Sequence, residues 1–78
     1  MREFSIALHS FADVQDFVSL ATVQPFRVII SNDHQRANAK SFMGMFSIDY
    51  RRPVTVSVDC GETEYLRFRA AAARFLAE

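Results

Sequence analysis

Few residues of this sequence have the types and spacing that chemistry requires. Its two histidines, His9 and His34, lie in separate segments and lack the i, i+4 spacing with which a helix presents two imidazoles to a metal ion. A single cysteine, Cys60, excludes an intrachain disulfide and a zinc site built on cysteine pairs. We find no nucleophile–base pair and no glycine-rich phosphate loop. The sequence therefore predicts a protein that is not an enzyme and has no metal or other cofactor.

Two serines stand where a hydroxyl could cap a helix. Ser10 precedes an apolar run and is followed three residues later by Asp13, a helix-start signature because both side chains satisfy free backbone N–H groups. Ser41 precedes the short apolar segment 42–46 and would cap it in the same way. A cap contributes roughly 0.5–2 kcal/mol, so a purely structural role is a sufficient explanation for either serine.

Hydrophobic periodicity predicts the elements that would position these residues. Apolar residues alternate with polar or small ones at 3–8, 26–30 and 54–59, which predicts strands, and 35–39 completes a hairpin after the turn 31–34. Apolar residues at helical spacing predict helices at 11–24, 42–46 and 64–76, the last capped by Thr63. The predicted buried stripes are Phe11, Val14, Phe17, Val18 and Ala21 in the first helix, and Tyr65, Phe68, Ala72, Phe75 and Leu76 in the last.

The order of these elements is β-α-β-β-α-β-α. It predicts an α+β fold of the open-faced β-sandwich type, in which three helices cover one face of a four-stranded, mostly antiparallel sheet. The 78 residues suffice for one domain, which we place at 1–78.

Composition limits the kinds of partner. Nine basic and nine acidic residues give a net charge of zero, whereas nucleic-acid binding needs a concentrated basic face. The densest basic cluster, Arg67, Arg69 and Arg74, is interpreted as solvated helix charge. No apolar run approaches the roughly 18–20 residues that span a bilayer, and the first residues do not form a secretory signal. We therefore expect a cytoplasmic protein that binds proteins and neither nucleic acid nor membrane.

The element order and the stretch 38–47, which reads N-A-K-S-F-M-G-M-F-S, resemble the HPr family. HPr is the histidine-containing phosphocarrier of the bacterial phosphoenolpyruvate sugar phosphotransferase system. The central segment of that family reads N-A-K-S, two apolar residues, Gly, two apolar residues and Ser. The resemblance covers nearly the whole chain and implies the same open-faced fold.

The sequence departs from the family where the phosphoryl group is carried. In the family, G-x-H-A-R-P precedes the first helix, and its histidine accepts the phosphoryl group. An ungapped alignment places Ser10 at the histidine, Ala12 at the arginine and Asp13 at the proline. Phosphohistidine transfer needs N–H donors and a nearby arginine, whereas an aspartate would repel the phosphoryl group. The resemblance thus predicts a protein that is not a competent phosphohistidine carrier, similar in this respect to catabolite-repression HPr.

His9 lies one residue from the family's histidine position. We interpret it as a polar residue at the end of the first strand, with a displaced phosphoacceptor as the alternative. His34 falls in the predicted turn, where we expect no catalytic role.

Ser41 aligns with the family's second phosphorylation site, which an ATP-dependent serine kinase modifies in some bacteria. Phe42, Met43 and Phe46 align with an apolar patch on which partner proteins dock. Burial in the domain's own core is the competing interpretation for all three, and position favours it for Phe46. The partners implied are an HPr-type serine kinase/phosphorylase, a transcriptional regulator or components of the phosphotransferase system.

Three functions remain open from the sequence. The leading hypothesis is a regulatory HPr-like protein that acts by protein–protein binding with Ser41 as its phosphorylation site. The second is a working phosphocarrier that uses His9. The third is an interaction module outside the phosphotransferase system, either a monomer or a weak homodimer formed through Phe42 and Met43.

Overall fold

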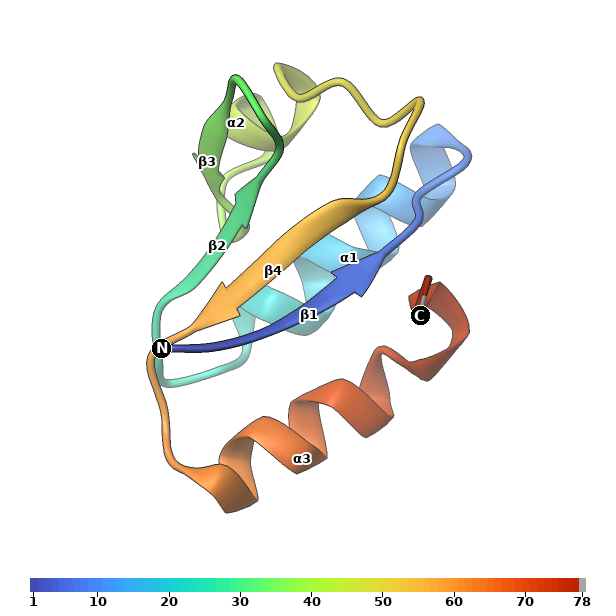
Figure 1. The fold of residues 1–78 in the computed structure, drawn as a ribbon. Coiled ribbons are helices and arrows are strands. Elements are labelled where there is room, and N and C mark those ends of the chain that lie inside the picture. Colours follow the sequence, from blue (N-terminus) through green and yellow to red (C-terminus); the bar gives the residue numbers. More distant parts are fainter. Residues whose placement is uncertain (78) are drawn as a thin grey trace.

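The computed structural model describes residues 1–77. Four strands form one sheet: β1 (Arg2–Ile6), β2 (Val28–Ser31), β3 (Arg36–Asn38) and β4 (Val54–Val58). Between and after them lie α1 (Phe11–Thr22), α2 (Phe42–Phe46), α3 (Glu62–Ala71) and the short 3₁₀ helix η1 (Ala73–Phe75). The strand order is β1-β4-β2-β3, and every neighbouring pair is antiparallel (Figure 1). The predicted α+β open-faced sandwich is confirmed.

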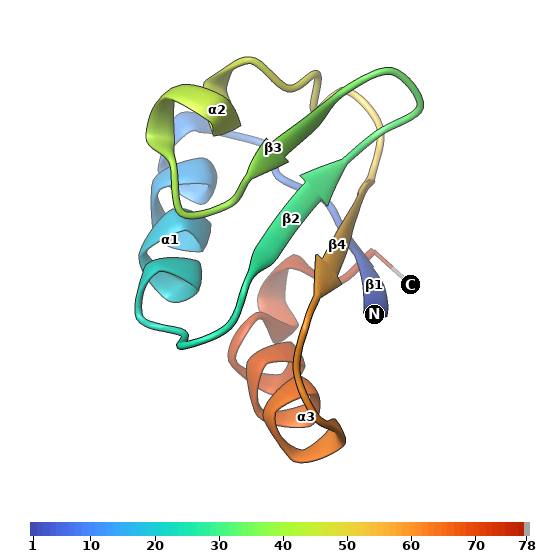
Figure 2. The same ribbon diagram turned by 90° about the vertical axis from the view of Figure 1, so that its left-hand side faces the viewer.

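The helices pack on the apolar face of the sheet, as the turned view shows (Figure 2). Phe68 of α3 stands at the centre of this layer, with its ring centroid 5.8 to 5.9 Å from those of Phe4, Phe17 and Phe26. Burying a ring of this size stabilises the fold by roughly 1.5–3 kcal/mol. These four aromatic side chains come from β1, α1, α3 and the loop before β2. Their contacts therefore fix α1 and α3 against the sheet.

The opposite face of the sheet carries two rows that cross all four strands and are polar except at Ile29. The register aligns Glu3, Ser57, Ile29 and Asn38 in one row, and Ser5, Thr55, Ser31 and Arg36 in the next. The Ser57 hydroxyl donates to the Glu3 carboxylate at 3.0 Å. This face is therefore rich in hydroxyl groups, as the alternation of the strands requires.

The C-terminal segment covers the outer edge of β1. The backbone N–H of Ala7 donates to the Phe75 carbonyl at 2.7 Å, and that of Ala77 donates to the Ser5 carbonyl at 3.0 Å. An isolated bridge joins Ile6 to Leu76. These bonds satisfy backbone groups that an edge strand would otherwise expose.

Several predicted boundaries are corrected by one to three residues. The first strand ends at Ile6, so His9 lies in the connection to α1, although Leu8 is buried as predicted. The strand predicted at 26–30 begins at Val28, and the one at 35–39 spans Arg36–Asn38.

The last helix differs more from its prediction. Gly61, not Thr63, is its N-cap, because the Glu64 carboxylate accepts the Gly61 N–H at 3.3 Å and starts the helix two residues earlier. The helix ends at Ala71, and η1 turns the chain so that Phe75 packs on Phe17 at 5.9 Å.

Candidate functional site

The start of α1 is closed by a carboxylate. Ser10 is the N-cap, and its hydroxyl accepts the Asp13 N–H at 3.1 Å. The Asp13 carboxylate in turn accepts the His9 N–H at 3.1 Å. Asp13 thus bonds back to the residue before the N-cap, and it places a negative charge in the first turn, at the positive end of the helix dipole.

An arginine from the C-terminal segment neutralises this carboxylate. Arg74 reaches Asp13 at 3.4 Å and Asp16 at 2.6 Å, and its guanidinium lies 4.0 Å from the centre of the Phe75 ring. A single guanidinium therefore pairs with two carboxylates, and the three side chains together keep one net negative charge.

His9 is exposed beside this cap and lines an apolar groove of about 460 Å³. The groove runs between the start of α1 and the segment 46–51, and Phe11, Phe46 and Arg51 also line it. Arg51 is the cation of this groove, but the Asp49 carboxylate holds it at 2.7 Å. The hydrogen bonds from Arg51 lower the pKa of Asp49 to about 2, so this carboxylate stays charged beside the guanidinium.

Ser41 caps α2 in the same way as Ser10 caps α1. Its hydroxyl accepts the Gly44 N–H at 3.2 Å, and the side chain is half-buried. The preceding turn is fixed by Asn38, whose side chain accepts the Lys40 N–H at 2.9 Å, and by the burial of Ala39. The Lys40 ammonium donates to the Gln24 carbonyl at 2.6 Å. The N-A-K-S stretch thus positions the Ser41 cap through backbone geometry.

A row of exposed aromatic rings lies beside Ser41. Phe42 and Phe46 are 43% and 45% exposed, and Met43 is 84% exposed. The centroids of Phe42 and Phe46 lie 6.0 Å apart, and Phe11 stacks on Phe46 at 5.0 Å with an interplanar angle of 13°. We call Phe11, Phe42, Met43 and Phe46 the aromatic ridge.

Two predictions are wrong at this ridge. Phe46 was favoured for the core, but Met45 is the buried residue of α2. Phe11 was assigned to the buried stripe of α1, yet it is 61% exposed. It is the first residue of the helix and stacks on Phe46 of α2. Periodicity gave no signal for this placement, because Phe11 does continue the apolar spacing of α1.

The other candidate residues form no reactive cluster. Within residues 1–77, no group of three or more His, Cys, Asp or Glu side chains could hold a metal ion. Burial raises the pKa of the Cys60 thiol, so the thiolate that reacts is disfavoured. Burial also raises the pKa of Tyr50 to about 12. No helix in the described part of the chain is long and apolar enough to cross a membrane.

Comparison with known proteins identifies the fold. No family model and no curated protein matches the sequence. Among solved structures, the chain is similar to HPr-C-His from Thermoanaerobacter tengcongensis, with a TM-score of 0.73 and 23% sequence identity. The match covers 95% of this chain and 92% of that one. The fold is therefore HPr-like from end to end.

Proposed function

We propose that this chain is a regulatory HPr-like protein that acts by binding other proteins, with Ser41 as its phosphorylation site. We further propose that it is not a phosphohistidine carrier. The observation on which the proposal depends is the Asp13 carboxylate in the first turn of α1, which is bonded to the His9 N–H and to Arg74.

A phosphoryl group at the start of α1 would meet this carboxylate. A helix N-terminus attracts an anion through its free N–H groups and dipole, but Asp13 already supplies a negative charge there. Arg74 is already paired with Asp13 and Asp16, and Arg51, which lines the same groove as His9, is paired with Asp49. A phosphoryl group on His9 would therefore meet the Asp13 carboxylate, while both arginines are already paired with carboxylates.

Ser41 has surroundings that favour phosphorylation. Its oxygen already faces the Gly44 N–H, and Gly44 has no side chain beside the hydroxyl, where a Cβ would lie 3.5 Å from the Ser41 Oγ. Phosphorylation would add about −1.5 to −2 charge at a place where backbone N–H groups can donate hydrogen bonds to the phosphate oxygens. The fold should tolerate the change, while the electrostatic character of the surface beside Phe42 and Met43 would change sign.

The aromatic ridge supplies the binding surface of the proposal. Exposed aromatic and methionine side chains are the types that dominate protein interfaces, and the flexible Met43 can adapt to more than one partner. Phe42 of the aromatic ridge directly follows Ser41 in the sequence. Phosphorylation of Ser41 could therefore strengthen or weaken the binding of a partner to the ridge without any change in the fold.

The test is phosphorylation by an HPr-type serine kinase with ATP, followed by intact-mass measurement. We expect one added phosphoryl group on the wild type and none on Ser41→Ala. Ser10→Ala is the matched control because Ser10 has the same capping geometry in α1, and it should be modified like the wild type. An unmodified wild type, or equal modification of Ser41→Ala, would contradict the proposal.

A second candidate function, a phosphocarrier using His9, is favoured by one observation. The His9 side chain is exposed and lines the groove that Arg51 also lines. Incubation with phosphoenolpyruvate and the first enzyme of the phosphotransferase system tests it. An acid-labile phosphoryl group that is lost in His9→Ala and kept in His34→Ala would establish this candidate and displace the first.

A further inference from the structure

A second cleft lies on the side of the sheet away from the helices, at the end where the β2–β3 turn meets the segment between α2 and β4. Its volume is about 670 Å³, within the range of small-molecule sites in proteins. Residues 31–34 line one wall, and residues 49, 51–53 and 55 line the other. Neither Ser41 nor the aromatic ridge takes part in it.

The two walls of this cleft are held together by the side chains of Asn32 and Gln35. The Asn32 carboxamide accepts the N–H groups of His34 and Gln35 at 2.9 and 2.8 Å, which fixes the turn. The same carboxamide donates to the Asp49 carbonyl at 3.4 Å.

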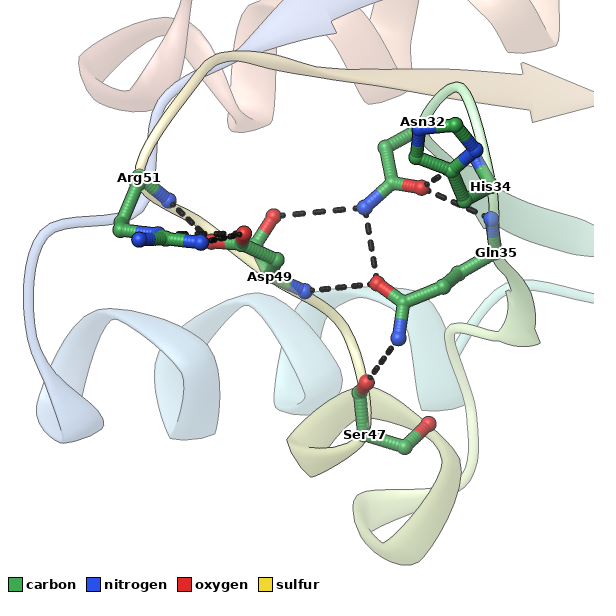
Figure 3. Close-up of polar contacts among 6 residues, drawn as sticks. All are labelled: Asn32, His34, Gln35, Ser47, Asp49 and Arg51. Carbon is green, nitrogen blue, oxygen red and sulfur yellow. Dashed lines mark hydrogen bonds and ion pairs between the residues drawn. The ribbon is translucent and has the colours of Figure 1, made fainter.

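Gln35 completes the connection between the walls (Figure 3). It donates to the Ser47 carbonyl at 2.6 Å and accepts the Asp49 N–H at 2.9 Å. The cleft is thus preformed, so a ligand would not have to order these loops on binding.

Several polar groups of the lining take no part in these connections. They are the guanidinium of Arg52, the imidazole of His34 and the hydroxyls of Ser31 and Thr55. Ser31 and Thr55 are register partners on adjacent strands, so their hydroxyls lie side by side. Arg52 is close enough to contribute to the lowered pKa of Asp49, which places its charge at the same wall.

The charges of the lining limit how much negative charge a ligand can carry. The positive charge of Arg51 is compensated by the Asp49 carboxylate, which it contacts at 2.7 Å. Among the other lining residues, Arg52 carries a positive charge and Asp33 a negative one. A guanidinium with neighbouring hydroxyls is the donor set that recognises an oxyanion. Asp33 would repel a molecule that carried several negative charges.

From this arrangement we propose that the cleft binds a small molecule through a single phosphate or carboxylate group, with Arg52, Ser31 and Thr55 as its donors. The site is separate from the proposed phosphorylation of Ser41, so either proposal can fail while the other holds.

The test is a titration of the ¹⁵N-labelled full chain with inorganic phosphate and, separately, with acetate, at constant ionic strength. Binding should shift the amide resonances of residues 31–34 and 49–55 in a saturable way, and the tighter of the two probes identifies the preferred oxyanion. Arg52→Gln should weaken binding at least about threefold. Asp33→Asn should tighten it about twofold, because it removes a repulsive charge.

Arg67→Gln is the matched control, since Arg67 is an exposed arginine on α3 that does not line the cleft. It should leave the affinity unchanged. Shifts that sodium chloride reproduces, shifts centred on residues 10–13 or 41–44, or an affinity that Arg52→Gln leaves unchanged would each overturn the proposal.

Discussion

The starts of α1 and α2 use the same cap with different third residues. In each, a serine hydroxyl accepts the N–H of the third helical residue, at 3.1 Å from Asp13 and at 3.2 Å from Gly44. At α1 the third residue carries a carboxylate that Arg74 pairs, whereas at α2 it has no side chain. Two sites with nearly equal capping hydrogen bonds therefore differ in their capacity to accept a further negative charge.

This difference shows which part of a helix start decides its chemistry. The capping hydroxyl stabilises both helices, but the residue at the third position determines whether the backbone donors remain available. In this chain, the aspartate at that position of α1 places a permanent negative charge at the start of the helix.

The largest effect is expected from giving α2 the third residue of α1. Gly44→Asp should slow phosphorylation of Ser41 by at least about tenfold, because a carboxylate beside the hydroxyl repels the incoming phosphoryl group. A Cβ at Gly44 would lie 3.4 Å from the Ala37 Cβ, a distance that side chains tolerate. Kinase rates followed by intact mass are the measurement.

Gly44→Asn is the control for that substitution, since it has the same shape without the charge. It should be phosphorylated within about threefold of the wild type. If Gly44→Asn is slowed as much as Gly44→Asp, shape and not charge decides, and the comparison of the two caps fails.

The converse change removes the carboxylate from α1. Asp13→Ala should lower the free energy of unfolding by about 1–2 kcal/mol, since it deletes the bond to the His9 N–H, the favourable dipole interaction and the contact with Arg74. Urea denaturation measures this change. Asp16→Ala, which removes the more exposed partner of Arg74, should cost less; a larger loss there would show that Asp13 is not the principal acid.

Removing the capping hydroxyls should have a smaller and nearly equal effect. Ser10→Ala and Ser41→Ala should each cost about 1 kcal/mol. In a double-mutant cycle, Ser10→Ala and Asp13→Ala should be non-additive, because the Ser10 hydroxyl bonds to the Asp13 N–H and so helps to place the Asp13 carboxylate. Additive losses would mean that these two bonds do not act together.

The smallest effect concerns Asp49, an acid outside both caps whose charge is held by Arg51. Its pKa in the folded protein, about 2, lies below the ordinary aspartate value of 3.8. The pair therefore stabilises the fold above pH 4, and this contribution is lost as the pH falls from about 4 through 2. Carboxyl ¹³C titration should give a midpoint near 2 in the wild type and one near 3.8 in Arg51→Gln. A wild-type midpoint near 3.8 would contradict the pairing.

Most of the fold could be predicted because its signals are local. The valines of β4 alternate with polar residues, and this pattern predicts the strand and its start at Val54 correctly, although it extends the strand to Asp59, one residue beyond its end at Val58. The Ser10 and Ser41 caps were likewise predicted from short spacings. The Thr63 cap was wrong because Gly61 lacks a side chain and begins α3 through Glu64, a residue that fits either start.

The candidate site was less predictable because its contacts join distant parts of the chain. Arg74 and Asp13 are 61 positions apart, and hydrophobic periodicity carries no information about such a pair. Phe11 and Phe46 were both favoured for the core on their spacing, whereas their stacking depends on how α1 meets α2. The polar cleft was not predicted either, since it requires the turn 31–34 to face the segment 49–53.

The position of β4 in the sheet has a consequence for synthesis. β4 pairs with both β1 and β2, and its residues partner Arg2 in one direction and Val28 in the other. While the chain emerges from the ribosome, β1 has no partner strand until Val58 is free. Only the β2–β3 hairpin and the first two helices can form before that point. Closing the long loop between β1 and β4 is the entropically costly step, so the nascent domain should acquire its sheet late and in a single cooperative event.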